Sequence, residues 1–438
     1  MNSEIDYNHI KKLLNFIDSS PSPWHACSKI AEGLEHAGYH QLFENETWNL
    51  EKDHGYYVIR DDSSIIAFKV GNKPLHQAGF RCIGAHVDSP TLRIKPNPVE
   101  EKSGINRLGV ETYGGAILAT FTDRDLSLAG RIVHKDNNNW LGCSSKLINL
   151  EDPLLRIPNL AIHMNREVNE KGLKLDKQAE LPLILGNISD SLPGEDKFKQ
   201  MLSEKSGIDN DDIISWELSV YDTQKAALYG AESEFFASRQ IDNLASCHAA
   251  VSALLASHQS VAATNVCAFF DHEEVGSNSI KGADGSFISD ILHRIAITLG
   301  CNDEQYKIAL AQSFMISADM SHAYHPNFPQ FYDDNHKILV NHGPAIKINA
   351  NQRYTSTAVT EAFFIRLCEA VDVPYQKYVH RTNLPCGSTI GPMVAAQLGI
   401  KSVDIGNPMW SMHSIRESAG VLDHNYLTSV LDNYFAGN

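Results

Sequence analysis

The sequence lacks any apolar run long enough to cross a membrane. No stretch of its 438 residues approaches the roughly 18 apolar residues that a membrane-spanning helix needs. The first residues, 1–7, also lack the basic start and apolar core of a signal peptide. The sequence therefore predicts a cytoplasmic protein with no membrane partner.

Positive charge is also scarce, because 37 lysines and arginines stand against 53 aspartates and glutamates. The formal net charge of −16 argues against a nucleic-acid partner, since phosphates need a basic protein face. The same excess of negative charge argues against an anionic membrane surface.

The eight cysteines include no Cys-x-x-Cys pair. Several of them, such as Cys82 and Cys267, lie in apolar runs that are typical of a protein core. This pattern indicates buried, reduced thiols in a reducing compartment.

The pattern of apolar residues changes twice along the chain. It predicts an amphipathic helix around Ile10 to Ile17, a helix over 26–37 and strands over 48–70. Short β-like runs broken by glycines follow over 92–133, and a helix with an exposed loop is expected over 195–212. From Asp242 onward, apolar strands alternate with helices, including 245–256 and 357–370, which is typical of a mostly parallel α/β sheet.

We therefore expect an α/β fold with two domains. A discontinuous catalytic domain, residues 1–91 and 221–438, is predicted to have a mostly parallel central sheet. A β-rich domain, residues 92–220, is predicted to be inserted into it.

Five residues with metal-binding side chains lie in separate short motifs. They are His86, Asp242, Glu274, Asp319 and His413, a set large enough to hold two divalent cations. His86 ends the apolar run 80–86, and Asp88 follows two residues later on the same side of an extended chain. A carboxylate at that place can orient a metal-bound histidine through its second ring nitrogen.

Glu273 stands directly beside Glu274, after the apolar run 266–270. Neighbouring residues at a strand end face different directions, so one glutamate can bind metal while the other accepts a proton. A bound dication lowers the pKa of its water from about 15.7 towards about 7, so a nearby carboxylate can complete the deprotonation.

Each of these motifs has a plain structural alternative when it is taken alone. His86 and Asp88 could form a structural hydrogen bond, and the two glutamates could be a solvated edge. Asp242 or Asp319 could cap a helix, and His413 could be a buried, hydrogen-bonded histidine. One dinuclear site accounts for the whole set.

The motifs together resemble the aspartyl aminopeptidases of the M18 metallopeptidase family. The similarity extends along the whole chain in one order. Its motifs include Ser20-Pro21-Ser22-Pro23-Trp24-His25, His86-Val87-Asp88-Ser89-Pro90, Glu111-Thr112-Tyr113-Gly114-Gly115, Arg239-Gln240-Ile241-Asp242-Asn243, Asp271-His272-Glu273-Glu274-Val275-Gly276, His322-Ala323-Tyr324-His325-Pro326 and Ser411-Met412-His413-Ser414.

The resemblance implies a role for each metal-binding residue. His86 and Asp319 would hold one metal, Glu274 and His413 the other, and Asp242 would bridge the two. Zinc is the expected metal at both positions, with manganese or cobalt as alternatives.

The resemblance also implies the catalytic and substrate-binding residues. Glu273 takes the place of the general base, and Lys347 and Tyr354 take the places of substrate-binding residues. His163 matches a histidine that enters the active site of a neighbouring subunit. The implied substrates are peptides with an acidic N-terminal residue, and the implied assembly is a homo-oligomer, usually a dodecamer.

Three positions are left open by this comparison. Asn383 stands where an aspartate is expected, which puts in doubt any role for a carboxylate there. His322 and His325 lie near Asp319 and could tune that ligand, support the substrate or be structural.

Two other functions fit the same residues. A deacylase on a similar two-metal scaffold would share the ligands but prefer blocked amines. A non-catalytic assembly or cargo protein could also retain the fold, although Glu273 beside a full ligand set counts against that alternative.

Overall fold

The computed structural model describes residues 7–187, 194–257 and 260–437. The expectation that no signal peptide is present depends on residues that lie almost wholly outside this part of the chain. No described helix is long and apolar enough to cross a membrane.

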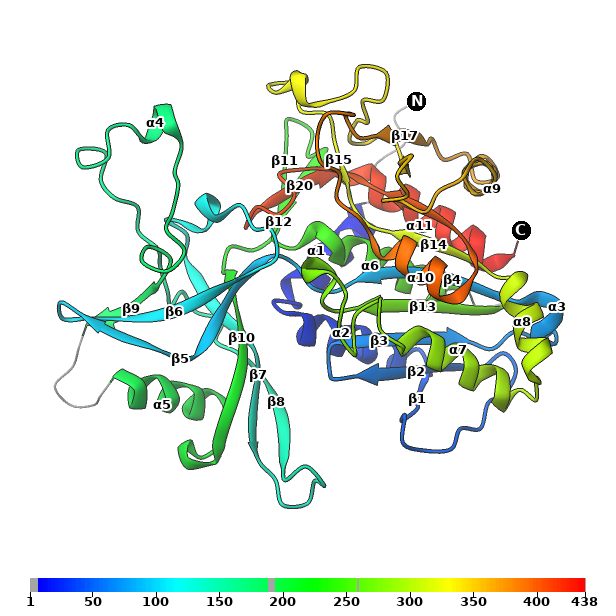
Figure 1. Cartoon of the computed structure of the whole chain (residues 1–438), viewed down its shortest axis with the longest axis horizontal. Coiled ribbons are helices and arrows are strands. Elements are labelled where there is room, and N and C mark those ends of the chain that lie inside the picture. The colour runs from blue at the N-terminus through cyan, green and yellow to red at the C-terminus, as the bar shows by residue number, and fades with distance from the viewer. Residues whose placement is uncertain (1–6, 188–193, 258–259, 438) are drawn as a thin grey trace.

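A large mixed sheet lies in one half of the molecule (Figure 1). Within the described ranges its nine strands follow the order β1 (His40–Gln41), β2 (Gly55–Arg60), β3 (Ser64–Lys69), β13 (Thr264–Phe270), β4 (Phe80–His86), β14 (Phe314–Ala318), β18 (Lys401–Gly406), β16 (Ala345–Ile348) and β17 (Gln376–Val379). The central strands β13, β4, β14 and β18 run parallel to one another. Strand β13 is buried along its whole length, as expected for a strand covered on both faces.

Helices cover both faces of this sheet and enclose two apolar cores. One face carries α1 (Tyr7–Asp18), α2 (Pro23–His36), α6 (Ile241–Ala256), α9 (Ala358–Glu369) and α11 (Val421–Ala436). The other face carries α3 (Leu75–Ala78), α7 (Phe287–Thr298), α8 (Asp303–Ala311) and α10 (Ile390–Leu398). The predicted α/β fold with a mostly parallel central sheet is therefore confirmed.

A second sheet lies to one side of the first and has an apolar core of its own (Figure 1). In the part of the chain that is described, it contains β8 (Cys143–Asn149), β7 (Leu126–Lys135), β10 (Ile213–Asp222), β5 (Thr91–Lys102), β6 (Ile105–Tyr113) and β9 (Leu183–Asn187), in that order. Helix α5 (Gly194–Ser206) packs against β5 and β8. These strands agree with the β-rich segment expected from the sequence, while the division into domains at residues 91 and 220 stays a prediction.

The segment between β8 and β9 projects away from both sheets and carries the short helix α4 (Val168–Lys171) (Figure 1). His163 lies in this segment and is exposed to solvent.

A small third sheet was not expected from the sequence. Among the described residues its strands are β11 (Ala227–Tyr229), β12 (Phe235–Ser238), β20 (Glu417–Gly420), β19 (Pro408–Trp410) and β15 (Ser321–His322). Each strand is only two to four residues long, too short for a clear alternation of apolar and polar residues. The loop between β19 and β20 carries His413, so this sheet positions one of the predicted ligands.

The individual helices agree closely with the predicted ones. The expected helix over 26–37 is α2, which begins after Ser22, whose hydroxyl accepts a hydrogen bond from the main-chain N–H of His25. Pro23 occupies the first turn, where its missing N–H removes no helical hydrogen bond. The helices predicted over 245–256 and 357–370 are α6 and α9.

Candidate metal centre

The predicted ligands converge at one edge of the large sheet. His86 is the last residue of β4, and Asp319 directly follows the neighbouring strand β14. Glu274 lies on the short 3-10 helix η3 (Glu273–Val275) just after β13, the other neighbour of β4. Parallel strands present their carboxyl ends at the same edge, which is why residues far apart in sequence meet there. Asp242 comes from the first turn of α6, and His413 from the β19–β20 loop.

Asp242 lies between the two histidines and faces each with a different oxygen. Its Oδ1 is 3.5 Å from Nε2 of His86, and its Oδ2 is 3.4 Å from Nε2 of His413. His86 Nε2 is also 3.5 Å from Oδ1 of Asp319, and His413 Nε2 is 3.3 Å from Oε1 of Glu274. The structure thus places all five residues together in two groups that share Asp242.

These separations fit two tetrahedral zinc ions. Zinc lies about 2.0–2.2 Å from nitrogen and carboxylate ligands, so two of its tetrahedral ligands are about 3.3–3.6 Å apart. The buried Oδ1 of Asp242 has no hydrogen-bond partner among the described residues, which leaves it available as a ligand atom. The ligand atoms of His86, Asp242 and Glu274 all lie within 4.8 Å of one another.

The electrostatics of this group also favour cation binding. Burial raises the pKa of Glu274 to about 7, an effect that His413 opposes and Asp242 reinforces. Burial also raises the pKa of Glu273 well above its usual value; His86 lowers it, whereas Asp319 and Glu274 raise it further. Burial lowers the pKa of His413, but its contacts with Asp242 and Glu274 outweigh burial and raise that pKa to about 11. Without a dication, the carboxyl groups of Glu273 and Glu274 therefore retain protons that a metal would displace. Burial also disfavours the ionised form of Asp242, but its contacts with His413 and His86 outweigh burial and lower its pKa.

The sequence predicted that the two glutamates lie at the end of an extended strand. In the structure they lie on a 3-10 helix that follows the strand. Strand β13 stops at Phe270, and His272 adopts a left-handed conformation with φ 65° that turns the chain into η3. The carboxylate of Asp88 accepts hydrogen bonds from the main-chain N–H groups of Glu273, at 3.2 Å, and Glu274, at 3.1 Å. These bonds use a carboxylate to satisfy the exposed N–H groups at the start of the turn.

Asp88 therefore positions more than one residue. Its main-chain carbonyl lies 3.0 Å from Nδ1 of His86, while its carboxylate oxygen Oδ1 is 3.5 Å from that nitrogen. The hydroxyl of Tyr113 donates to its other oxygen at 2.6 Å. Hydrogen bonds to a histidine's second nitrogen fix its tautomer, so Nε2 of His86 is left facing the site.

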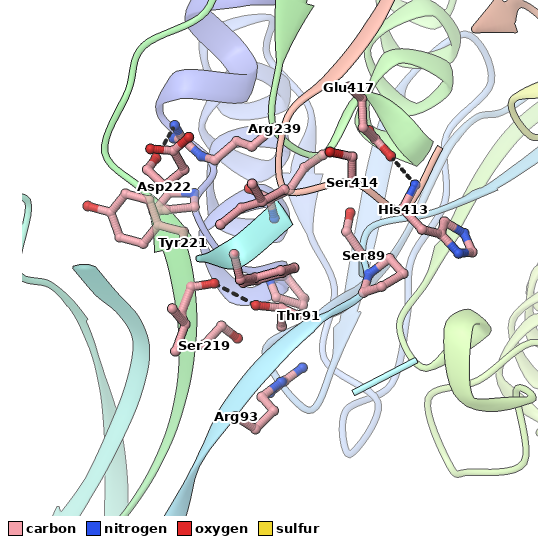
Figure 2. Close-up of a pocket in the computed structure, with 17 residues that line it drawn as sticks. Ser89, Thr91, Arg93, Ser219, Tyr221, Asp222, Arg239, His413, Ser414 and Glu417 are labelled. Carbon is pink, nitrogen blue, oxygen red and sulfur yellow. Dashed lines mark hydrogen bonds between the residues drawn. The ribbon is translucent and has the colours of Figure 1, made fainter. Parts of the chain in front are cut away.

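Glu417 contacts two of the predicted ligands, which the sequence did not indicate. Its buried carboxylate accepts a hydrogen bond from the main-chain N–H of Asp242, at 3.0 Å. It accepts a second from the main-chain N–H of His413, at 2.7 Å (Figure 2). One carboxylate thus holds the backbones of two predicted ligands. The sequence signal was an acidic residue four positions after His413.

A small cavity lies behind His413, at the junction of the two large sheets (Figure 2). Its volume is about 30 Å³, room for roughly two water molecules. The hydroxyl of Thr91, on β5, donates to the carbonyl of Val220, on β10, at 2.5 Å beside this cavity.

The front of the site opens into a cavity of about 120 Å³. Besides the ligands and Glu273, it is lined by His322, Lys347, Tyr354, Gly387, Ser388 and Met412, among others. Lys347 is buried, and its Nζ lies 3.3 Å from Oδ2 of Asp319 and 5.4 Å from the centre of the Tyr354 ring. His163 and Asn383 do not line this cavity in the described chain, and both are exposed.

The family of the chain follows from comparison with known proteins. The model of the family described as "Aminopeptidase I zinc metalloprotease (M18)" matches residues 16–435. The chain belongs to the M18 family of aminopeptidases. It is 44% identical over 431 residues to a probable M18 family aminopeptidase 2 of Ectopseudomonas mendocina (strain ymp), and the match covers 98% of each chain.

Solved structures agree with this assignment. An Ape4 structure in complex with Nbr1 is 36% identical, has a TM-score of 0.94 and covers 98% of this chain and 85% of its own. A dodecamer of S. cerevisiae mApe1 is 25% identical, has a TM-score of 0.85 and covers 98% of this chain and 96% of its own. This M18 protein is thus a metalloaminopeptidase, and a divalent metal, with zinc as the family's metal, is its cofactor.

Proposed function

We propose that the protein is a two-metal aminopeptidase that removes aspartate or glutamate from the N-terminus of peptides. The observation that carries this proposal is the placement of Asp242 between two groups of ligands, with one oxygen toward each histidine. His86 and Asp319 are assigned to one metal, Glu274 and His413 to the other, and Asp242 to both.

Glu273 is assigned the role of general base. Zinc, when bound, polarises the carbonyl of the substrate and makes a water molecule acidic enough to lose its proton near neutral pH. Glu273 lines the cavity without being needed as a ligand, so its carboxylate accepts that proton and later transfers it to the departing amine.

Lys347 is assigned to the acidic side chain of the substrate. An ammonium group has three hydrogen-bond donors, and the contact with Asp319 uses one of them. Lys347 lines the same cavity as the assigned base. Tyr354 lies beside Lys347 and is assigned to the same part of the substrate.

The active form is proposed to be a homo-oligomer, with a dodecamer as the expected size. In a single chain, the side chain of His163 is exposed and does not line the site cavity. Three of its neighbours, Leu160, Ile162 and Met164, are 57%, 48% and 75% exposed, an apolar surface that suits a protein contact. His163 is therefore assigned to the active site of a neighbouring copy, where it would bind the oxyanion of the reaction.

A reducing, cytoplasmic location is part of the proposal. All eight cysteines are free thiols in the structure, and five of them are fully buried. Such a set is typical of a protein that is not stabilised by disulfides.

The decisive experiment compares three substrates with zinc present: an aspartyl peptide, a leucyl peptide and an N-acetylated aspartyl peptide. The proposal requires that the aspartyl peptide, whose N-terminal amine is free, is cleaved fastest. Preferred cleavage of the acetylated substrate would identify a deacylase instead, and loss of all activity in zinc-loaded protein would leave the non-catalytic alternative.

A further inference from the structure

Asp404 has a completely buried carboxylate that does not line the site cavity. It lies in β18, which runs between β14 and β16 in the large sheet. It is none of the assigned metal ligands. Because a carboxylate in the interior needs hydrogen-bond partners, its contacts show which parts of the chain it holds.

One oxygen of Asp404 holds the segment that carries Tyr354. Oδ2 accepts a hydrogen bond from the main-chain N–H of Thr355, the residue after Tyr354, at 2.6 Å. The main chain of Asp404 contacts the same segment, since its N–H donates to Oγ of Ser356 at 3.0 Å. We call residues 353–356 the tyrosine segment. It is fixed to β18 directly after Tyr354.

The other oxygen holds a second loop at the site. Oδ1 of Asp404 accepts a hydrogen bond from the hydroxyl of Thr389 at 2.7 Å. Thr389 ends the glycine loop, residues 387–389, whose first two members line the cavity. The oxygen of the same hydroxyl accepts a hydrogen bond from the main-chain N–H of Gly391 at 3.3 Å and so caps α10. One carboxylate thus joins two loops, with one oxygen for each.

The two loops also contact each other directly. The hydroxyl of Ser388 donates to the main-chain carbonyl of Arg353 at 3.0 Å. Ser388 is partly exposed, whereas the contacts of the Asp404 carboxylate are buried. The tyrosine segment and the glycine loop are therefore connected both near the solvent and in the interior, which fixes the distance between them.

The carboxylate of Asp404 has little room to shift. A β-carbon at Gly391, in the first turn of α10, would lie 2.6 Å from Oδ2 and 2.8 Å from Oδ1. Both separations are shorter than a van der Waals contact, so the carboxylate can lie against this turn because residue 391 is glycine. The first turn of a helix also favours a negative charge. Asp404 is therefore held by packing as well as by hydrogen bonds.

Lys347 reaches the site from a different element. It lies on β16, which pairs with β18. Its Nζ is 5.4 Å from the centre of the Tyr354 ring. The sheet fixes the backbone of Lys347, whereas the place of Tyr354 depends on the bonds that Asp404 makes. The separation between the ammonium group and the tyrosine ring is therefore set by how Asp404 holds the tyrosine segment.

We propose that Asp404 is a positioning residue for recognition of the acidic side chain of the substrate. It holds the tyrosine segment and the glycine loop at the distance from Lys347 at which the ring and the ammonium group receive one carboxylate. This inference rests on the proposed function, which assigns Lys347 and Tyr354 to that side chain. In the described chain, the hydrogen bonds of the Asp404 carboxylate go to neither Glu273 nor an assigned ligand. Its loss should therefore change the choice of substrate and leave the chemical step intact.

The test measures kcat and KM for an aspartyl and a leucyl peptide in Asp404→Asn and Thr389→Val. An asparagine side chain has one acceptor oxygen, so it cannot accept from both Thr355 and Thr389. Valine has the shape of threonine without the hydroxyl. In each variant, the ratio of kcat/KM for the aspartyl peptide to that for the leucyl peptide should fall about tenfold, as for one lost hydrogen bond to a charged group. The kcat for the leucyl peptide and the zinc content should be unchanged.

Two further variants separate positioning from stability. Thr389→Ser keeps the hydroxyl and should restore the ratio that Thr389→Val loses. Asp423→Asn is the matched control, because Asp423 is also buried and accepts hydrogen bonds from two main-chain N–H groups. These belong to Asn341, at 2.6 Å, and Gly343, at 2.8 Å, neither of which lines the site cavity. Asp404→Asn and Asp423→Asn should both lower the melting temperature, and only Asp404→Asn should change the ratio.

The position of Tyr354 gives a measurement that does not depend on the proposed function. Crystal structures of Asp404→Asn and Thr389→Val should show its ring displaced relative to Lys347, whereas those of Thr389→Ser and Asp423→Asn should not. Either an unchanged ratio of kcat/KM or an unmoved ring in folded Asp404→Asn would overturn the proposal. A wild type without preference for the aspartyl peptide would refute the proposed function, and the crystallographic comparison would then decide whether Asp404 positions Tyr354.

Discussion

Nζ of Lys347 lies 3.3 Å from Oδ2 of Asp319, with both side chains largely buried. The cation assigned to the substrate therefore also neutralises a carboxylate that is assigned to a metal. An acidic substrate side chain would share this ammonium with Asp319, so specificity and metal binding are connected through one residue.

Lys347→Met should weaken the binding of acidic substrates more than the binding of neutral ones. Loss of a hydrogen bond to a charged group costs about 1.5–3 kcal/mol, which corresponds to a rise in KM of about 10- to 150-fold for an aspartyl peptide. The KM of a leucyl peptide should change much less. Zinc content must be measured in parallel, because the contact with Asp319 is also lost. Equal losses on both peptides at full zinc content would show that another residue recognises the acid.

Glu273→Gln should retain its metals but lose turnover. An amide cannot accept the proton, so kcat should fall by about 10²- to 10⁴-fold while zinc content is unchanged. Glu274→Gln, a change at the neighbouring residue, is the matched control. This variant should lose both zinc and activity, because Oε1 of Glu274 faces His413. A zinc-loaded Glu273→Gln protein with near-normal kcat would refute the assigned role.

Glu417→Gln should destabilise the protein and weaken zinc binding together. The amide has only one acceptor oxygen, so either the N–H of Asp242 or that of His413 loses its partner. A buried N–H without a partner costs about 1–3 kcal/mol, which urea unfolding of the metal-free protein would measure. Since both backbones belong to assigned ligands, zinc titration should show a lower affinity as well. Unchanged affinity would show that Glu417 serves stability alone.

Zinc binding should release protons and become tighter as pH rises. The pKa of His413 is raised to about 11 in the metal-free site, so zinc displaces its proton at any pH below that value. Glu274, with a pKa of about 7, contributes a further proton below neutrality and little above it. Each released proton changes the affinity by about tenfold per pH unit, so the dependence should be steeper from pH 6 to 7 than from 7 to 8. Calorimetry in two buffers of different ionisation enthalpy counts these protons, and identical heats would contradict the prediction.

Subunits of Glu273→Gln and His163→Ala, each inactive alone, should recover part of the activity when mixed. If His163 acts on a neighbouring copy, mixed assemblies pair an intact Glu273 with an intact His163. Mixing Glu273→Gln with Glu274→Gln is the control, because both residues lie on the same short helix of one chain and no mixed site is complete. Absence of rescue after verified exchange, or full activity in a particle with the mass of one chain, would exclude a shared site.

The sequence by itself determined the secondary structure around the site and the kinds of ligand available there. The apolar run that ends at His86 and the one that ends at Phe270 became β4 and β13, because continuous apolar runs of that length form buried strands. The helices that follow Asp242 and Thr357 also agree with the expected ranges. Local periodicity is sufficient for these predictions, since each depends on residues within a few turns.

Only the tertiary structure decided which oxygen faces which histidine and which groups hold the ligands in place. Glu417 contacts Asp242 across 175 residues, and Asp88 contacts Glu273 across 185. Such contacts depend on how strands and helices pack in three dimensions, whereas a sequence pattern reports only which side chains share one face of one element.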